Sequence, residues 1–217
     1  MSINMKLCGN RSLIDLKTSI ESGAEYIGVV FADSKRQVDP EELAEWLKQI
    51  QFKKNQKLVG VFVNPTIGEL DGVMKNIDLD VIQLHGNEDI AHVLNIKERF
   101  PCTIWKAIHH TDASVELMNL YKGVIDGYVV DAKSKEAWGG TGKQFDWKAV
   151  PQYIEEAEMQ SVPCFIAGGV NPENVFELAS LKPHGIDVSS GIESEGKKDA
   201  NKIEKIMRRS KHVSHIS

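Results

Sequence analysis

Tyr26-Ile27-Gly28-Val29-Val30-Phe31 is a short apolar run, rich in β-branched residues and almost without polar alternation. Such a run is typical of a strand that is buried on both faces of a parallel sheet. Similar runs predict eight strands, at Met5–Cys8, Tyr26–Phe31, Leu58–Val63, Val81–Leu84, Thr103–Ile108, Gly127–Asp131, Cys164–Ala167 and Gly185–Val188. In a chain of 217 residues, eight such units have about 27 residues each, enough for one strand, one helix and two short loops.

The segments between these strands carry the start and stop signals of helices. Ser12 and Asp39 are suited to cap helices that begin at Leu13 and at Pro40, and Asn171-Pro172 repeats the second pattern. The expected helices are Leu13–Glu21, one that begins at Pro40, Ile67–Lys75, Asp89–Arg99, Ser114–Leu120, Trp147–Glu158, Val175–Leu181 and Lys202–Arg209.

Eight alternating strands and helices predict an α/β protein, a single (β/α)8 TIM barrel that spans residues 1–217 as one domain. The rival is an open, doubly wound sheet, which usually carries a Gly-x-Gly-x-x-Gly fingerprint after its first strand. The corresponding turn reads Cys8-Gly9-Asn10-Arg11, which lacks that fingerprint, so the barrel is favoured.

The composition is that of an ordinary globular protein, with 41% hydrophobic and 26% charged residues and a formal net charge of −5. The isoelectric point near 5.8 and mean hydropathy of −0.27 indicate neither a nucleic-acid binder nor a membrane protein. The basic segment Lys197–Lys211 is interpreted as a solvated face of a terminal helix. Three cysteines without paired spacing and no apolar signal segment predict a soluble cytoplasmic protein with free thiols.

In a barrel of this kind, the active site lies at the carboxyl ends of the strands. The seventh strand is followed by Gly168 and Gly169, and the eighth by Ser189, Ser190 and Gly191, which predicts a phosphate site. A third glycine cluster, which includes Gly142, follows the sixth strand. Each cluster alone also fits an ordinary turn, but two of them at the last two strands favour a phosphorylated small-molecule substrate.

Cys8 and Asp131 are the candidate acid and base, because they end the first and sixth strands and should face each other across the barrel mouth. Strand alternation places Lys6 on the same side as Cys8, where its charge would favour the thiolate, unless it pairs with a carboxylate deeper in the barrel. Adjacent histidines at 109 and 110 point opposite ways and do not form a chelate, and no other metal spacing occurs.

Several motifs, in this order, resemble the phosphoribosylanthranilate isomerase family over about residues 5 to 209. They are Lys6-Leu7-Cys8-Gly9 with Arg11 and Asp15, Ser34-Lys35-Arg36, Gly60-Val61-Phe62-Val63-Asn64, Gln83-Leu84-His85-Gly86, Asp131 with Gly139-Gly140-Thr141-Gly142-Lys143, Ala167-Gly168-Gly169-Val170-Asn171-Pro172 and Asp187-Val188-Ser189-Ser190-Gly191-Ile192-Glu193. Asn10, where the family usually has a bulky apolar residue, and Ala132 depart from the pattern.

The resemblance implies an isomerase of tryptophan biosynthesis that needs no cofactor and acts as a monomer or homodimer. It implies Cys8 as general base and Asp131 as general acid of an Amadori rearrangement. Arg36, His85 and Asp187 would contact the substrate, with Arg36 on its anthranilate carboxylate. One alternative is an aldose–ketose isomerase of histidine synthesis, which would favour two aspartates where this chain has Cys8 and Asp131. Another is the next enzyme of tryptophan synthesis, which needs a lysine acid and a glutamate base, and for which Lys106 is the only tempting lysine. A third is a non-catalytic phosphate-binding barrel.

Overall fold

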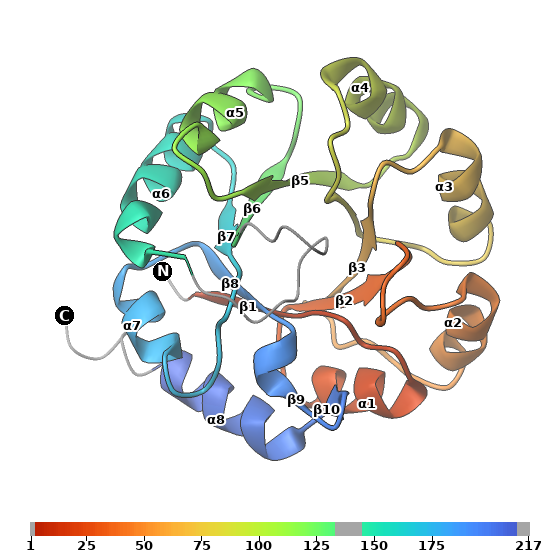
Figure 1. Cartoon of the computed structure of the whole chain (residues 1–217). Coiled ribbons are helices and arrows are strands. Elements are labelled where there is room, and N and C mark those ends of the chain that lie inside the picture. Colours follow the sequence, from red (N-terminus) through yellow and green to blue (C-terminus); the bar gives the residue numbers. More distant parts are fainter. Residues whose placement is uncertain (1–2, 133–144, 212–217) are drawn as a thin grey trace.

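The computed structural model describes residues 3–132 and 145–211, in which eight parallel strands pair in chain order and close into a barrel (Figure 1). The strands are β1 (Asn4–Leu7), β2 (Tyr26–Val30), β3 (Lys57–Phe62), β4 (Val81–Leu84), β5 (Thr103–His109), β6 (Gly127–Asp131), β7 (Cys164–Ile166) and β8 (Gly185–Val188). The helices surround the barrel: α1 (Leu13–Glu21), α2 (Pro40–Leu47), α3 (Ile67–Met74), α4 (Ile90–Arg99), α5 (Ser114–Leu120), α6 (Val150–Met159), α7 (Val175–Ser180) and α8 (Ala200–Lys211).

The predicted (β/α)8 fold is therefore confirmed, and the strand ends differ from expectation by one residue at most. Ser12 and Asp39 cap α1 and α2 through their side chains as the sequence predicts. Asn171 accepts from the backbone N–H groups of Glu173 and Asn174, as predicted, but these bonds close a turn before the helix, and the residue directly before α7 is Asn174.

Two further segments differ from their predictions. The single helix expected over Trp147–Glu158 begins as a short 3-10 helix, η1 (Trp147–Ala149), before α6 continues it. The chain after β8 forms a second 3-10 helix, η2 (Ser190–Ile192), and a small hairpin of β9 (Glu193–Ser194) and β10 (Lys197–Lys198). The backbone of Lys198 donates to Asp15, which fixes the hairpin against α1.

Alternate residues of each strand point into the barrel and build it up in layers. The lowest layer is apolar and aromatic: Tyr26 packs on Trp105 and Phe165 with ring centroids 4.9 and 5.1 Å apart. The next inward positions on β1 and β4 carry polar side chains, Lys6 and Gln83, both buried. The interior thus changes from an apolar floor to a polar mouth at the carboxyl ends of the strands.

Across the described residues, no helix has the length and apolar character needed to cross a membrane.

Candidate active site

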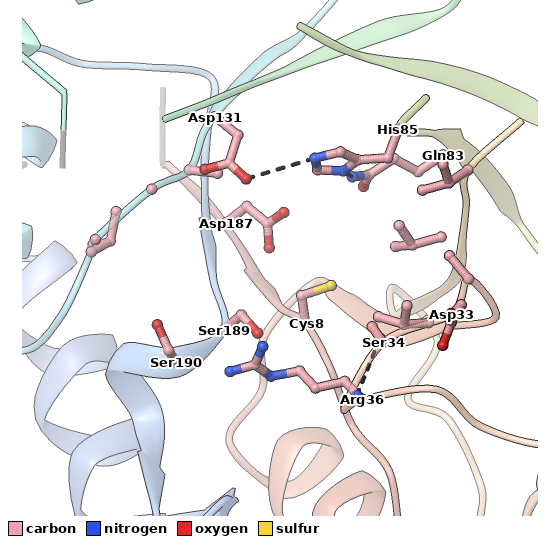
Figure 2. Close-up of a pocket in the computed structure, with 18 residues that line it drawn as sticks. Cys8, Asp33, Ser34, Arg36, Gln83, His85, Asp131, Asp187, Ser189 and Ser190 are labelled. Carbon is pink, nitrogen blue, oxygen red and sulfur yellow. Dashed lines mark hydrogen bonds and ion pairs between the residues drawn. The ribbon is translucent and has the colours of Figure 1, made fainter. Parts of the chain in front are cut away.

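A pocket that is open to solvent lies at the carboxyl ends of the barrel strands (Figure 2). It collects side chains from almost every strand end and the loops that follow. The lining residues are Cys8, Val30, Ala32, Asp33, Ser34, Arg36, Val61, Val63, Gln83, His85, Asp131, Ala167, Gly168, Gly169, Val170, Asp187, Ser189 and Ser190. The predicted acid, base and substrate-contacting residues therefore all line one pocket, at the strand ends where they were expected.

Cys8 follows β1 and is fixed by its backbone, whose N–H donates to the carbonyl of Val188 at 2.8 Å. The thiol lies tightly against β2, because a Cβ added at Gly28 would come within 2.7 Å of its Sγ. Beneath it, the Nζ atom of Lys6 bonds to Oδ2 of Asp187 at 2.7 Å and also contacts the thiol. The two alternatives given for Lys6 are therefore both correct, because its ammonium group pairs with a carboxylate and also faces Cys8.

Burial raises the pKa of the Cys8 thiol above its usual range, and the charge of Lys6 only partly opposes this. Burial also lowers the pKa of Lys6, but the charges of Asp187 and Cys8 outweigh it, so the lysine stays protonated. Lys6 favours the thiolate as expected, but the net pKa of the thiol is still raised, because desolvation of the thiolate exceeds the stabilisation by the ammonium group.

Asp131 ends β6 across the pocket from Cys8, and its Oδ1 accepts from the backbone N–H of Ala132 at 2.7 Å. Burial, followed by the charge of Asp187, raises the pKa of Asp131 to about 7. The loop after β7 packs closely against it, since a Cβ at Gly168 would lie 2.9 Å from Oδ1 and the φ of Gly168 is +85°. Asp131 can therefore carry or release a proton near neutral pH.

His85 reaches into the pocket from the end of β4 and lies 3.7 Å from Asp131, measured from Nε2 to Oδ2. His109, the last residue of β5, and His110, which follows it, diverge as expected: the His109 ring lies 5.3 Å from that of His85, whereas Nδ1 of His110 lies 2.7 Å from the Tyr153 hydroxyl. Within the described residues, no group of three or more His, Cys, Asp or Glu side chains is arranged to hold a metal ion.

Arg36 lies beside Ser189 at the edge of the pocket and is held by a carboxylate that the sequence did not assign. Its Nε and Nη2 atoms donate to both oxygens of Glu193 at 2.7 and 2.8 Å. Lys198 donates to the same carboxylate at 3.1 Å and to the Cys8 carbonyl at 2.6 Å. Burial raises the pKa of Glu193, but Arg36 and Lys198 outweigh it, so the net pKa is lowered and the carboxylate is ionised.

Sequence reasoning missed Glu193 and Lys198. Glu193 could have been found, because it closes the Ser-Ser-Gly-Ile-Glu stretch already singled out after β8. Lys198 was wrongly assigned to a solvated face: its side chain is only 1% exposed and bonds the Cys8 carbonyl and Glu193.

Four of the predicted phosphate-site residues line the pocket: Gly168, Gly169, Ser189 and Ser190. Gly191 does not line it. It belongs to η2, where a Cβ would overlap the backbone of Val170. Gly142, the remaining predicted phosphate-site residue, lies outside the described residues.

Lys106, the candidate lysine of a different tryptophan-pathway enzyme, does not line the pocket. Its Nζ pairs with Glu88 at 3.0 Å and donates to the backbone carbonyls of Leu84, Gly86 and Ala107. These bonds make it part of the barrel wall.

The fold and the arrangement of the pocket define a (β/α)8-barrel enzyme. The family model described as N-(5'-phosphoribosyl)anthranilate (PRA) isomerase matches residues 5–209. The chain is 48% identical over 209 residues to N-(5'-phosphoribosyl)anthranilate isomerase of Geobacillus thermodenitrificans, which covers 96% of this chain and 94% of that relative. The chain belongs to the N-(5'-phosphoribosyl)anthranilate isomerase family, a family of isomerases of tryptophan biosynthesis.

Solved structures of this family have the same fold as this chain. One is a structure of monomers generated from the dimeric phosphoribosylanthranilate isomerase of Thermotoga maritima. It superimposes on this chain with a TM-score of 0.79 at 31% identity, and the match covers 97% of this chain and 99% of that chain. A phosphoribosyl anthranilate isomerase in complex with reduced 1-(o-carboxyphenylamino)-1-deoxyribulose 5-phosphate gives a TM-score of 0.80 at 30% identity, with the same coverage of both chains. That relative therefore binds a phosphorylated ligand.

Proposed function

We propose that the chain converts N-(5'-phosphoribosyl)anthranilate into 1-(2-carboxyphenylamino)-1-deoxyribulose 5-phosphate, with Asp131 as general acid and Cys8 as general base. The observation that carries this proposal is the pair of buried acidic groups on opposite walls of one pocket (Figure 2). An Amadori rearrangement needs one proton given and another removed at neighbouring atoms of a single substrate. Two opposed groups suit that chemistry.

In the first step, Asp131 protonates the furanose ring oxygen, and the C1–O bond breaks to leave an iminium ion. A pKa of about 7 keeps a large fraction of this carboxyl group protonated at neutral pH, as an acid requires. The substrate nitrogen supplies the electron pair of the iminium, so the ring opens without an external cofactor.

In the second step, the Cys8 thiolate removes the C2 proton, and the enolamine that forms then tautomerises to the ketone. Because burial raises the pKa of this thiol, the thiolate depends on the positive charges around it. Lys6 and Lys198 supply two of them, and the cationic iminium adds a third at the moment when the base is needed.

Substrate binding is assigned to the remaining pocket residues. Gly168, Gly169, Ser189 and Ser190 would hold the phosphate through backbone N–H groups and hydroxyls. The assignment of Gly142 and Gly191 to the same phosphate site rests on the sequence alone. Arg36 would bind the anthranilate carboxylate through guanidinium donors that Glu193 leaves available, since it takes two of the five. Asp187 would face the substrate amine, and His85 the sugar.

The proposal is tested by following the fluorescence of anthranilate adducts after the purified protein is added to freshly made substrate. We expect turnover, and a loss in kcat of about 10²–10⁴-fold in Cys8→Ser and in Asp131→Asn. Cys102→Ser, which changes a thiol next to the start of β5 outside the pocket, is the matched control and should keep full activity. A Cys8→Ser variant that retains more than about half of kcat would show that the base is another group.

We further propose that residues 1–217 form one domain and that the protein is cytoplasmic. It would act as a monomer or a homodimer on this small phosphorylated substrate, and it would bind no nucleic acid, membrane or metal.

A further inference from the structure

A line of three polar side chains leads from the barrel wall to the candidate acid. Gln83 and His85 are alternate residues at the end of β4, so both point into the barrel. The Nε2 atom of Gln83 lies 3.2 Å from Nδ1 of His85. The other ring nitrogen of His85, Nε2, lies 3.7 Å from Oδ2 of Asp131 (Figure 2). The imidazole therefore stands between an amide and a carboxyl group.

The amide determines which nitrogen of His85 carries the proton. In the orientation that the structure gives the Gln83 amide, its nitrogen faces Nδ1 of His85. An amide nitrogen donates and does not accept, so in this orientation Nδ1 presents its lone pair to Gln83. Burial, followed by the charges of His109, Lys106 and Lys6, lowers the pKa of His85 to about 3, so the ring is neutral. A neutral ring with an unprotonated Nδ1 carries its single proton on Nε2, the atom that faces Asp131.

This Nε2–H group is buried and makes no hydrogen bond to any protein atom that the structure describes. Because His85 lines the pocket, this donor faces the space in which a substrate would bind. Its distance of 3.7 Å from Oδ2 is longer than a hydrogen bond. Such contacts in empty active sites often shorten when the substrate binds.

We propose that Gln83 is a positioning residue that fixes His85 as the Nε2–H tautomer and so aims a neutral hydrogen-bond donor at Asp131. The inference rests on the proposed function, in which Asp131 gives its proton to the sugar ring oxygen. That step leaves a carboxylate, which the N–H dipole stabilises. The opposite tautomer would present a lone pair to the same carboxylate and oppose the proton transfer.

None of the other described groups around Asp131 that are named here donates a hydrogen bond to its Oδ2 atom. Asp187, from β8, carries a negative charge that opposes the carboxylate, and Lys6 favours it from below but is already bound to Asp187. The Ala132 N–H bonds the other oxygen, Oδ1. His85 is thus the donor directed at Oδ2.

The tautomer can be read directly by ¹⁵N NMR of histidine-labelled protein without substrate. The chain has seven histidines, and the signals of His85 are assigned as those that disappear in His85→Asn. We expect a protonated Nε2 and an unprotonated, hydrogen-bonded Nδ1 in the wild type. A protonated Nδ1 would overturn the proposal, and this outcome is independent of whether the protein turns over its substrate.

Gln83→Glu tests the cause, because an ionised carboxylate only accepts and therefore requires a proton on Nδ1. We expect the ¹⁵N shift of Nδ1 to move to that of a protonated nitrogen, and kcat to fall about 5- to 10-fold with little change in KM. Gln49→Glu, which makes the same change on an exposed side chain, should leave both unchanged. If Gln83→Glu does not fold, Gln83→Met still removes the donor and should shift the Nδ1 signal. Wild-type shifts and kcat in a folded Gln83 variant would refute the proposal.

Discussion

The two walls of the pocket are built from different chemistry. Around Cys8, the side chains are charged and joined in ion pairs, and the participants are Lys6, Asp187, Arg36, Glu193 and Lys198. Around Asp131, the neighbours from β4 and β5 are Gln83 and His85 with His109, and His85 is held neutral. One wall therefore supplies cations, and the other supplies a neutral donor.

Burial acts on both walls in the same direction and has opposite consequences for the two candidate groups. It raises the pKa of Asp131 to about 7, which supplies a proton donor near neutral pH. It also raises the pKa of Cys8, which hinders a base, so cations are needed on that side. The placement of charge, rather than burial, distinguishes the proposed acid from the proposed base.

The largest effect is expected at Lys6, the buried cation beneath Cys8. Lys6→Met leaves the Asp187 carboxylate buried without its partner, which should lower the free energy of unfolding by about 3–5 kcal/mol. It should also raise the thiol pKa further, because the largest stabilising charge is lost. Both are measured by urea unfolding and by the pH dependence of Cys8 alkylation, with Cys102 and Cys164 replaced by alanine.

The matched control is the double variant Lys6→Met/Asp187→Leu, which removes the orphaned carboxylate and should recover much of the stability. An unchanged alkylation profile in Lys6→Met would show that Lys6 serves only the ion pair.

Asp131→Asn tests the opposite wall through stability. Since the pKa of Asp131 is raised from 3.8 to about 7, the folded protein binds the proton more tightly than the unfolded chain. The favourable contribution is therefore complete below pH about 4 and is lost as pH rises toward about 7. The variant does not titrate, so it should match the wild type at pH 4 and exceed it by up to about 4 kcal/mol above pH 7. Parallel stability curves from pH 4 to 8 would mean that Asp131 is ionised throughout.

A smaller effect, on binding, is expected at Arg36. Charge-assisted hydrogen bonds contribute about 1.5–3 kcal/mol, so Arg36→Met should weaken binding of the product about 10- to 100-fold, measured by calorimetry. An aniline analogue without the carboxylate should bind the wild type more weakly and lose little further affinity in the variant. Equal losses for both ligands would indicate that Arg36 only orders Glu193.

The barrel and its two opposed groups could be predicted because both depend on regular patterns. Apolar β-branched runs recur at even intervals, and strand alternation places Lys6 under Cys8 and Val129 under Asp131. The resemblance to a known family assigned roles to the same positions. Because these patterns are repeated along the chain, the predicted fold does not depend on the exact residue at which each strand ends.

The β9–β10 hairpin could not be predicted, because strands of two residues carry no periodic pattern. The burial of Lys198 depends on the Cys8 carbonyl, 190 positions away in the chain. The tautomer of His85 likewise depends on how one amide of Gln83 is oriented, which no spacing of residues reveals. Such features follow from packing between distant segments.

The smallest effect is expected at Lys205, which shares its basic segment with Lys198 and tests what distinguishes them. Lys205 bonds Glu173 at the surface, with side chains 40% and 67% exposed, whereas Lys198 is 1% exposed and bonds the Cys8 carbonyl. Lys205→Met should change Tm by less than about 2 °C and leave Cys8 alkylation unchanged, because water and salt screen exposed pairs. Lys198→Met should lower Tm by about 5 °C or more and raise the thiol pKa, since a buried charge near the thiolate is removed. Equal effects of the two variants would mean that the charge of the segment as a whole matters, and not the contact of Lys198 with the Cys8 wall.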